Sequence, residues 1–107
     1  VKFELTSDKY EQLKGQYTNL SLPDLAIIGE KGKIKFVALD KKNSNSPNAK
    51  VTVGETNIEF KAYIKAESLK FIPGDYDVTL SKAKIGHFKH KKVNIQYWIA
   101  LEADSIF

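Results

Sequence analysis

The stretch Tyr97-Trp98-Ile99-Ala100-Leu101-Glu102-Ala103-Asp104-Ser105 decides the fold that we predict for this chain. Its first five residues are almost wholly apolar, which predicts a buried strand that is central in a sheet or covered on both faces. The acidic residues that follow predict an exit from the sheet into solvent. Trp98, Tyr63, Tyr76 and Tyr97 fall on strand-like segments with alternating spacing, which favours packing in the core.

The composition describes one globular domain and excludes several kinds of site. The chain has 107 residues, no cysteine, no methionine and a net charge of +4. Without cysteine there is no disulfide, thiolate nucleophile or cysteine-based zinc site. No apolar run is long enough to cross a membrane, and no secretory signal pattern is present. Because residue 1 is Val, we expect a processed form, a recombinant fragment or the later part of a longer protein.

All 17 basic residues are lysine, and none is arginine. The planar fork of arginine is preferred for bidentate recognition of guanine edges and phosphates. Lysine carries a mobile point charge that suits loose, sequence-independent contact with phosphates. A lysine-rich composition is equally typical of an AT-rich genome, so the bias alone does not assign DNA binding.

The hydrophobic pattern predicts one domain built from two similar halves, residues 1–53 and 54–107. In the first half a strand is followed by an amphipathic helix over 7–20 and three strands, and the second half repeats that order with a short helix over 65–72. The predicted strands cover residues 1–5, 25–28, 33–39, 50–53, 58–64, 76–80 and a last hairpin over 87–101. Residues 40–48 are polar and predict an exposed loop. Helices segregated on one face of antiparallel sheet define an α+β domain.

Three segments resemble the DNA sliding clamps of T-even-type bacteriophages. Lys70-Phe71-Ile72-Pro73-Gly74-Asp75-Tyr76 is similar to the clamp turn in which a short helix ends at Pro-Gly before a Tyr-led strand. Ala100-Leu101-Glu102-Ala103-Asp104-Ser105 resembles the end of the clamp subunit, and the step Gln12-Leu13 resembles its first helix. The resemblance covers nearly the whole chain, but only as the C-terminal domain, so the N-terminal clamp domain would be absent from this chain.

The resemblance implies a DNA-clamp (PCNA-like) fold: two strand-helix-strands units, with antiparallel sheets outside and two helices on one face. It also implies a non-enzymatic processivity factor for DNA polymerase. Copies would associate into a ring, a trimer in two-domain members, that encircles duplex DNA loosely and without regard to sequence. The implied partners are the DNA polymerase and the clamp loader, with no cofactor, no metal and no membrane, in the cytoplasm of an infected bacterial host.

The same resemblance implies which lysines face DNA. Lys70 is the best match, because the family carries lysine just before the Pro-Gly turn. Lys9 and Lys14 flank the polar face of the first predicted helix, and Lys65 begins the second. Ordinary solvated lysines are the alternative for each of them.

Clamps bind their partners through a short peptide that docks in an apolar pocket near the C-terminus of the subunit. The apolar residues in that region are Leu101, Ala103, Ile106 and Phe107, which makes them the implied docking residues. The alternative is that Ile106 and Phe107 fold back onto the core.

Other chemistry receives little support from the sequence. His87 and His90 are three residues apart, which does not place them on one face of a strand, and we expect both to face solvent. Residues 82–92 hold five lysines and predict a solvated edge hairpin. This hairpin, with Tyr97 or Trp98 as a stacking platform, suggests an alternative function as a monomeric module that binds single-stranded nucleic acid. A third possibility is a small phage structural protein that makes only protein contacts.

Overall fold

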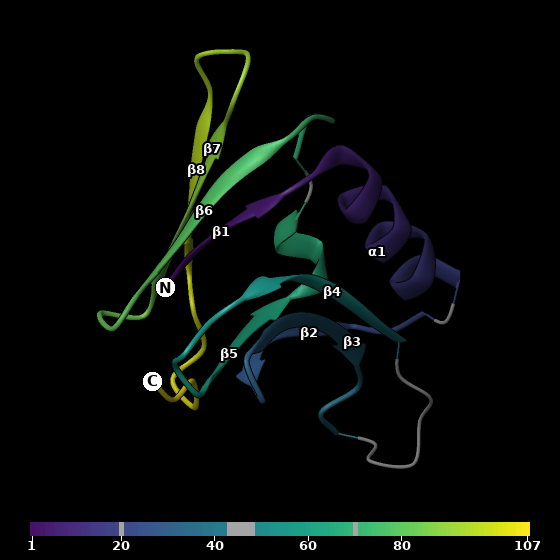
Figure 1. Cartoon of the computed structure of the whole chain (residues 1–107). Helices are drawn as coiled ribbons and strands as arrows, with labels where there is room; N and C mark the ends of the chain where they lie inside the picture. Colours follow the sequence, from purple (N-terminus) through teal and green to yellow (C-terminus); the bar gives the residue numbers. More distant parts are fainter. Residues whose placement is uncertain (20, 43–48, 70) are drawn as a thin grey trace.

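The computed structural model describes residues 1–19, 21–42, 49–69 and 71–107. Two four-stranded antiparallel sheets form the walls of the domain (Figure 1). The first sheet has the order β1-β6-β7-β8, with β1 Lys2–Leu5, β6 Tyr76–Ser81, β7 Ile85–His90 and β8 Gln96–Ala100. The second has the order β4-β3-β2-β5, with β2 Asp24–Glu30, β3 Lys33–Leu39, β4 Ala49–Glu55 and β5 Phe60–Lys65.

Three strands of each sheet come from one half of the chain, and the fourth strand comes from the other half. β1 pairs with β6, and β5 pairs with β2, so the first strand of each half leaves its own half and joins the opposite sheet. The two halves of the chain therefore cannot separate without breaking backbone hydrogen bonds in both sheets. Their facing sides form one core, which includes Leu5, Ile27, Phe36, Val78 and Phe88.

The helical content is smaller than the sequence predicts. α1 Ser7–Asn19 is the one α-helix among the described residues, and it packs against β3 and β4. The second helix, expected over 65–72, is instead η1 Ala66–Leu69, a 3-10 helix of 4 residues. Lys65 belongs to β5, because it pairs with Asp24 of β2, and this pairing shortens the helical segment at its start.

The prediction of a central last strand is wrong. β8 lies at the edge of its sheet, and of its five residues only Ile99 is buried. Trp98, expected in the core, is 64% exposed. A run of apolar residues can form a strand that is buried on both faces, or a strand that is buried on one face and exposes apolar side chains on the other. Periodicity alone does not distinguish these two kinds of strand. The basic segment 82–92 is not at an edge either, because β7 lies between β6 and β8.

The hairpin turn between β2 and β3 is shorter than the gap between the two strands that the sequence predicts. The strand predicted over 25–28 is longer in the structure, because β2 includes Gly29 and continues to Glu30. The hairpin turn is Lys31-Gly32, and both residues have positive φ, 51° and 80°. Two successive positive φ values match the twist of a two-residue β-hairpin, and Gly32 adopts its value without steric cost. Most of the predicted loop over 40–48, residues 43–48, lies outside the described residues.

Candidate DNA-facing helix and partner surfaces

The outward face of α1 carries the first candidate site. Lys9 and Lys14 are exposed, as the sequence predicts, and neither forms an ion pair with any residue in the described part of the chain. Asp8 and Glu11 are exposed on the same helix. Two lysines against two carboxylates give this face little net charge, so it can attract phosphates only through the flexible lysine side chains at its flanks.

α1 is held rigidly by buried contacts on its inner face. Tyr10 and Leu13 are buried in the core, and the Tyr10 hydroxyl donates a hydrogen bond to the carbonyl of Leu69 at 2.6 Å. Burial raises the pKa of Tyr10. At the start of the helix the Thr6 hydroxyl accepts a hydrogen bond from the Lys9 amide at 3.3 Å, which caps the N-terminus of α1. The helix therefore keeps a fixed orientation relative to both sheets.

The other two predicted DNA-facing lysines differ from this pair. Lys70, the best match by resemblance, lies outside the described residues. Lys65 lies at the end of β5, where its Nζ contacts Asp24 Oδ1 at 2.8 Å and Glu102 Oε1 at 3.4 Å. Hydrogen bonding to Asp24 raises the pKa of Lys65. Because its ammonium is already paired with two carboxylates, Lys65 attracts a phosphate less strongly than Lys9 or Lys14.

Asp24 is the buried centre of this ion-pair network, at 2% exposure. Burial by itself would raise the pKa of its carboxyl, but hydrogen bonds from the Lys65 side chain and the Lys41 backbone amide outweigh burial and lower it. The Lys41 side chain continues the network, with Nζ at 2.7 Å from Asp104 and 2.8 Å from Glu102. The network joins β2, β5 and the C-terminal segment.

The predicted docking residues do not form one surface. Leu101 is buried in the core, so a partner cannot reach it. Ala103 is exposed, and its carbonyl accepts a hydrogen bond from the Lys84 ammonium at 2.5 Å. Ile106 is 67% exposed, whereas the Phe107 ring stacks on Phe60 with centroids 5.6 Å apart. Fold-back onto the core, the alternative for both, therefore applies to Phe107 and not to Ile106.

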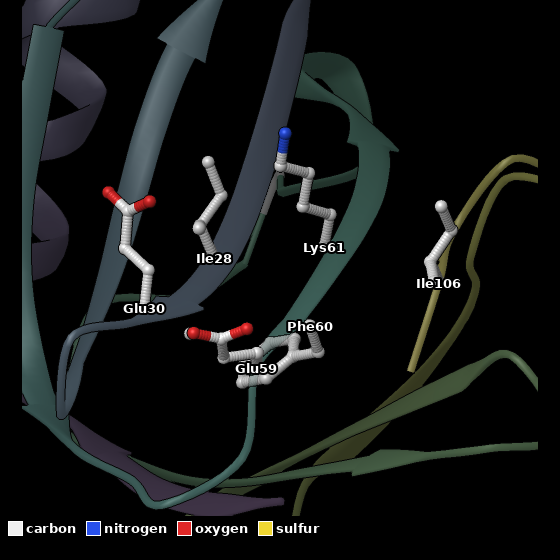
Figure 2. Close-up of a pocket in the computed structure, with 7 residues that line it drawn as sticks. Ile28, Glu30, Glu59, Phe60, Lys61 and Ile106 are labelled. Atoms are coloured by element: carbon white, nitrogen blue, oxygen red, sulfur yellow. The ribbon is translucent and has the colours of Figure 1, made fainter.

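A hollow of about 400 Å³ opens beside Ile106. Figure 2 shows Ile106 on the C-terminal segment at one side of the hollow, with Glu30 and Glu59 toward the other. Ile28, Phe60 and Lys61 complete the labelled lining. The hollow is apolar at Ile28 and Phe60 and charged at its rim.

A second apolar surface, which the sequence analysis missed, lies on the outer face of the β1-β6-β7-β8 sheet. Trp98 stacks on His87 with ring centroids 5.0 Å apart, and both point away from the core. Ile85, 44% exposed, pairs with Ala100 on the same face. A large exposed aromatic side chain next to an exposed isoleucine is typical of a surface that another protein covers. Which face of β8 lies on the outside of the sheet, and so exposes Trp98, could not be seen in the sequence.

The two histidines have separate roles, and the expectation that both face solvent is wrong for His90. His90 is buried, with Nε2 at 3.0 Å from the Pro73 carbonyl oxygen. Its Nδ1 accepts hydrogen bonds from the amides of Lys92 and Val93 at 3.0 and 3.1 Å. His90 therefore fixes the Pro73-Gly74 turn against the β7–β8 loop.

No cluster of three or more His, Cys, Asp or Glu residues suited to a metal ion occurs in the described ranges. Among the same residues, no helix has the length and apolar character needed to span a bilayer.

Two antiparallel sheets that exchange their first strands, with a lysine-flanked helix on the outside, define an α+β domain of the clamp type.

Comparison with known proteins agrees with this class. Residues 2–103 match the family described as gp45 sliding clamp, C terminal. The sliding clamp of Vibrio phage KVP40 is 30% identical, in an alignment that covers 96% of this chain and 48% of that protein. The chain belongs to the gp45 sliding clamp family and corresponds to its C-terminal part. It spans about half the length of the curated relative that it matches.

Proposed function

We propose that this chain is the C-terminal domain of a DNA polymerase processivity factor. Copies of the protein would close a ring, a trimer if it has two domains like the family members that the sequence resembles. The ring would encircle duplex DNA in the cytoplasm of an infected bacterium, with a clamp loader to open and close it. The observation that carries this proposal is the exposed face of α1, rigid in position but nearly neutral in charge.

A nearly neutral lining suits a protein that must remain on DNA and still move along it. Each tight phosphate contact would have to break and re-form at every step of sliding. Lys9 and Lys14, at the flanks of α1, can keep the duplex centred through long, flexible side chains. Lys70 is proposed for the same role by resemblance alone, and Lys65 is the weakest of the four because Asp24 and Glu102 engage it.

The free edge of β8 supports assembly with a further clamp domain. Ile95 and Leu101 form their backbone hydrogen bonds toward β7, so Gln96, Trp98 and Ala100 direct their backbone groups away from the sheet. Exposed edge strands usually carry lysine or proline, which blocks unwanted pairing. β8 has neither, and this is expected of an edge that pairs with another domain of the ring.

We place the docking surface for the polymerase peptide on Trp98, Ile85 and Ala100, with Ala103 beyond its end. Ile106, which is exposed, and Phe107, which folds back onto Phe60, lie at β5 instead. The alternative function in single-strand binding loses one of its two platforms, because Tyr97 stacks on Phe71 at 4.1 Å and its hydroxyl accepts a hydrogen bond from Ile72.

Salt-dependent binding to a short linear duplex tests the lining. Each phosphate contact contributes about −0.9 to the slope of log affinity against log salt. We expect a shallow slope that falls by about 2 when Lys9 and Lys14 are both changed to Gln. Lys50→Gln is the matched control, because Lys50 is exposed opposite Val37, on the face of its sheet that points away from the core. A slope unchanged in the double variant, or nanomolar preference for single strands, would contradict the proposal.

A further inference from the structure

The first turn of α1 contains backbone amides that helical hydrogen bonding leaves free. The first amides of any α-helix have no carbonyl partner within the helix, and together they act as about half a positive charge. In α1 these amides belong to Ser7, Asp8 and Lys9, because the Tyr10 amide already donates to the Thr6 carbonyl at 2.9 Å. A helix start of this kind attracts phosphate and carboxylate groups. A helix that faces DNA would therefore tend to hold a phosphate at this end.

A carboxylate of the same chain occupies this position instead. Asp75 Oδ1 accepts a hydrogen bond from the Ser7 amide at 2.6 Å, although 68 residues separate the two. In Figure 1 the segment that leads into β6 lies beside the start of α1. Ser7 and Asp75 are both half-buried, so the bond between them lies at the surface. The Asp75 carboxylate thus stands where an oxygen of a bound phosphate would lie.

Contacts that do not involve α1 hold the backbone of Asp75 in place. Its carbonyl accepts a hydrogen bond from the Lys91 amide at 3.0 Å. The preceding residue, Gly74, has φ +145° and lies against His90, whose Nε2 is 3.0 Å from the Pro73 carbonyl oxygen. An acceptor that is already fixed loses little conformational freedom when it binds the amide. Asp75 therefore competes effectively with a phosphate that arrives from solution.

We propose that Asp75 is a specificity-determining residue for DNA contact: its carboxylate fills the phosphate-binding position at the start of α1 and so prevents the domain from gripping the duplex. This inference rests on the proposed function, because it requires that α1 faces DNA. Asp8, exposed in the same turn, adds negative charge there, but Asp75 is the residue that bonds the Ser7 amide. A duplex that no helix start grips can move without a contact that must be remade at every step.

The effect expected on removal of Asp75 is opposite to that of a residue with only a structural role. Loss of a purely structural residue would weaken DNA binding. Loss of the Asp75 carboxylate should tighten it, because the Ser7 amide becomes free to donate to a phosphate that the exposed Lys9 also attracts. α1 itself keeps the Thr6 cap and the buried hydrogen bond of the Tyr10 hydroxyl.

Salt-dependent binding of the full-length protein to a short linear duplex tests this sign. We expect Asp75→Ala to bind about tenfold more tightly at about 0.1 M salt, with a slope of log affinity against log salt that is steeper by about 0.9. Asp75→Asn keeps an oxygen that can accept from the Ser7 amide, so its slope should equal that of the unaltered protein. Asp8→Asn is the matched control, because it removes the same charge from the same turn and leaves Asp75 in place. A slope that is unchanged or shallower in Asp75→Ala, or equally steep in either asparagine variant, would overturn the proposal.

Titration with inorganic phosphate tests the occupied position without DNA, so its outcome is independent of the proposed function. The amide resonance of Ser7 is followed by NMR. We expect no shift in the unaltered protein and a saturable shift in Asp75→Ala. A saturable shift in the unaltered protein would overturn the proposal even if no variant folded. The absence of a shift in folded Asp75→Ala would overturn it as well.

Discussion

Removal of one hydroxyl should loosen α1 from the rest of the domain. Tyr10→Phe keeps the ring, which is 1% exposed, but deletes the oxygen that donates to the Leu69 carbonyl at 2.6 Å and accepts from the Phe71 amide at 3.3 Å. Both backbone groups would then be buried without a partner. An unsatisfied buried polar group costs about 1–3 kcal/mol, and the longer of the two bonds contributes less. We therefore expect unfolding to become easier by about 2 kcal/mol.

Thermal and urea unfolding, each followed by circular dichroism, measure this loss. For a domain of this size, about 2 kcal/mol corresponds to a fall in Tm of roughly 8–16 °C. Tyr63→Phe is the control, because the Tyr63 hydroxyl forms no hydrogen bond with any residue that the structure describes, and its ring still lies under Lys41. We expect the control to change stability by less than about 0.5 kcal/mol. Equal losses in the two variants would refute the role assigned to the Tyr10 hydroxyl.

Three other changes give separate tests. Gly74→Ala should destabilise the fold strongly, as a lowered urea midpoint, because Gly74 has φ +145° and a Cβ there would lie 2.1 Å from His90 Nε2. Trp98→Ala should leave the urea midpoint nearly unchanged, since the side chain is 64% exposed, yet abolish stimulation of the partner polymerase in primer extension. The folded-state pKa of Asp24 is lowered, so its stabilisation is present above the unfolded value of about 3.9 and is lost as pH falls through the folded value. The stability difference between the unaltered protein and Asp24→Asn, measured in urea at pH 7, 5 and 3, should accordingly shrink between pH 5 and pH 3. A constant difference would contradict this linkage.

The strands and the first helix could be predicted because each depends on local periodicity. The apolar spacing of Tyr10 and Leu13 identifies α1, and the alternation around Phe36 and Val78 identifies β3 and β6. The second helix could not be delimited, because pairing between Lys65 and Asp24, 41 residues apart, extends β5 into it. Strand order within a sheet is likewise a long-range property, and for that reason β8 was placed at the centre.

In the candidate sites, too, the features set by local sequence could be predicted and the features set by long-range contacts could not. Exposure of Lys9 and Lys14 follows from the helical repeat alone. The engagement of Lys65 by Glu102, the burial of Leu101 and the exposure of Trp98 all depend on contacts between segments distant in sequence. Resemblance to a family indicated that docking residues lie near the C-terminus, but only the sheet topology shows which of them a partner could reach.

The central claim is that the protein which carries this domain remains on DNA by encirclement and not by tight contact. The direct measurement is retention of the loaded protein on nicked circular duplex at about 0.5 M salt, where exposed charges interact over only a few ångströms. Gel filtration is run before and after a restriction enzyme cuts the circle once. Encirclement predicts that the protein stays with the circle and is lost from the linear form. Equal retention on both forms, or loss from both in proportion to salt, would contradict the claim.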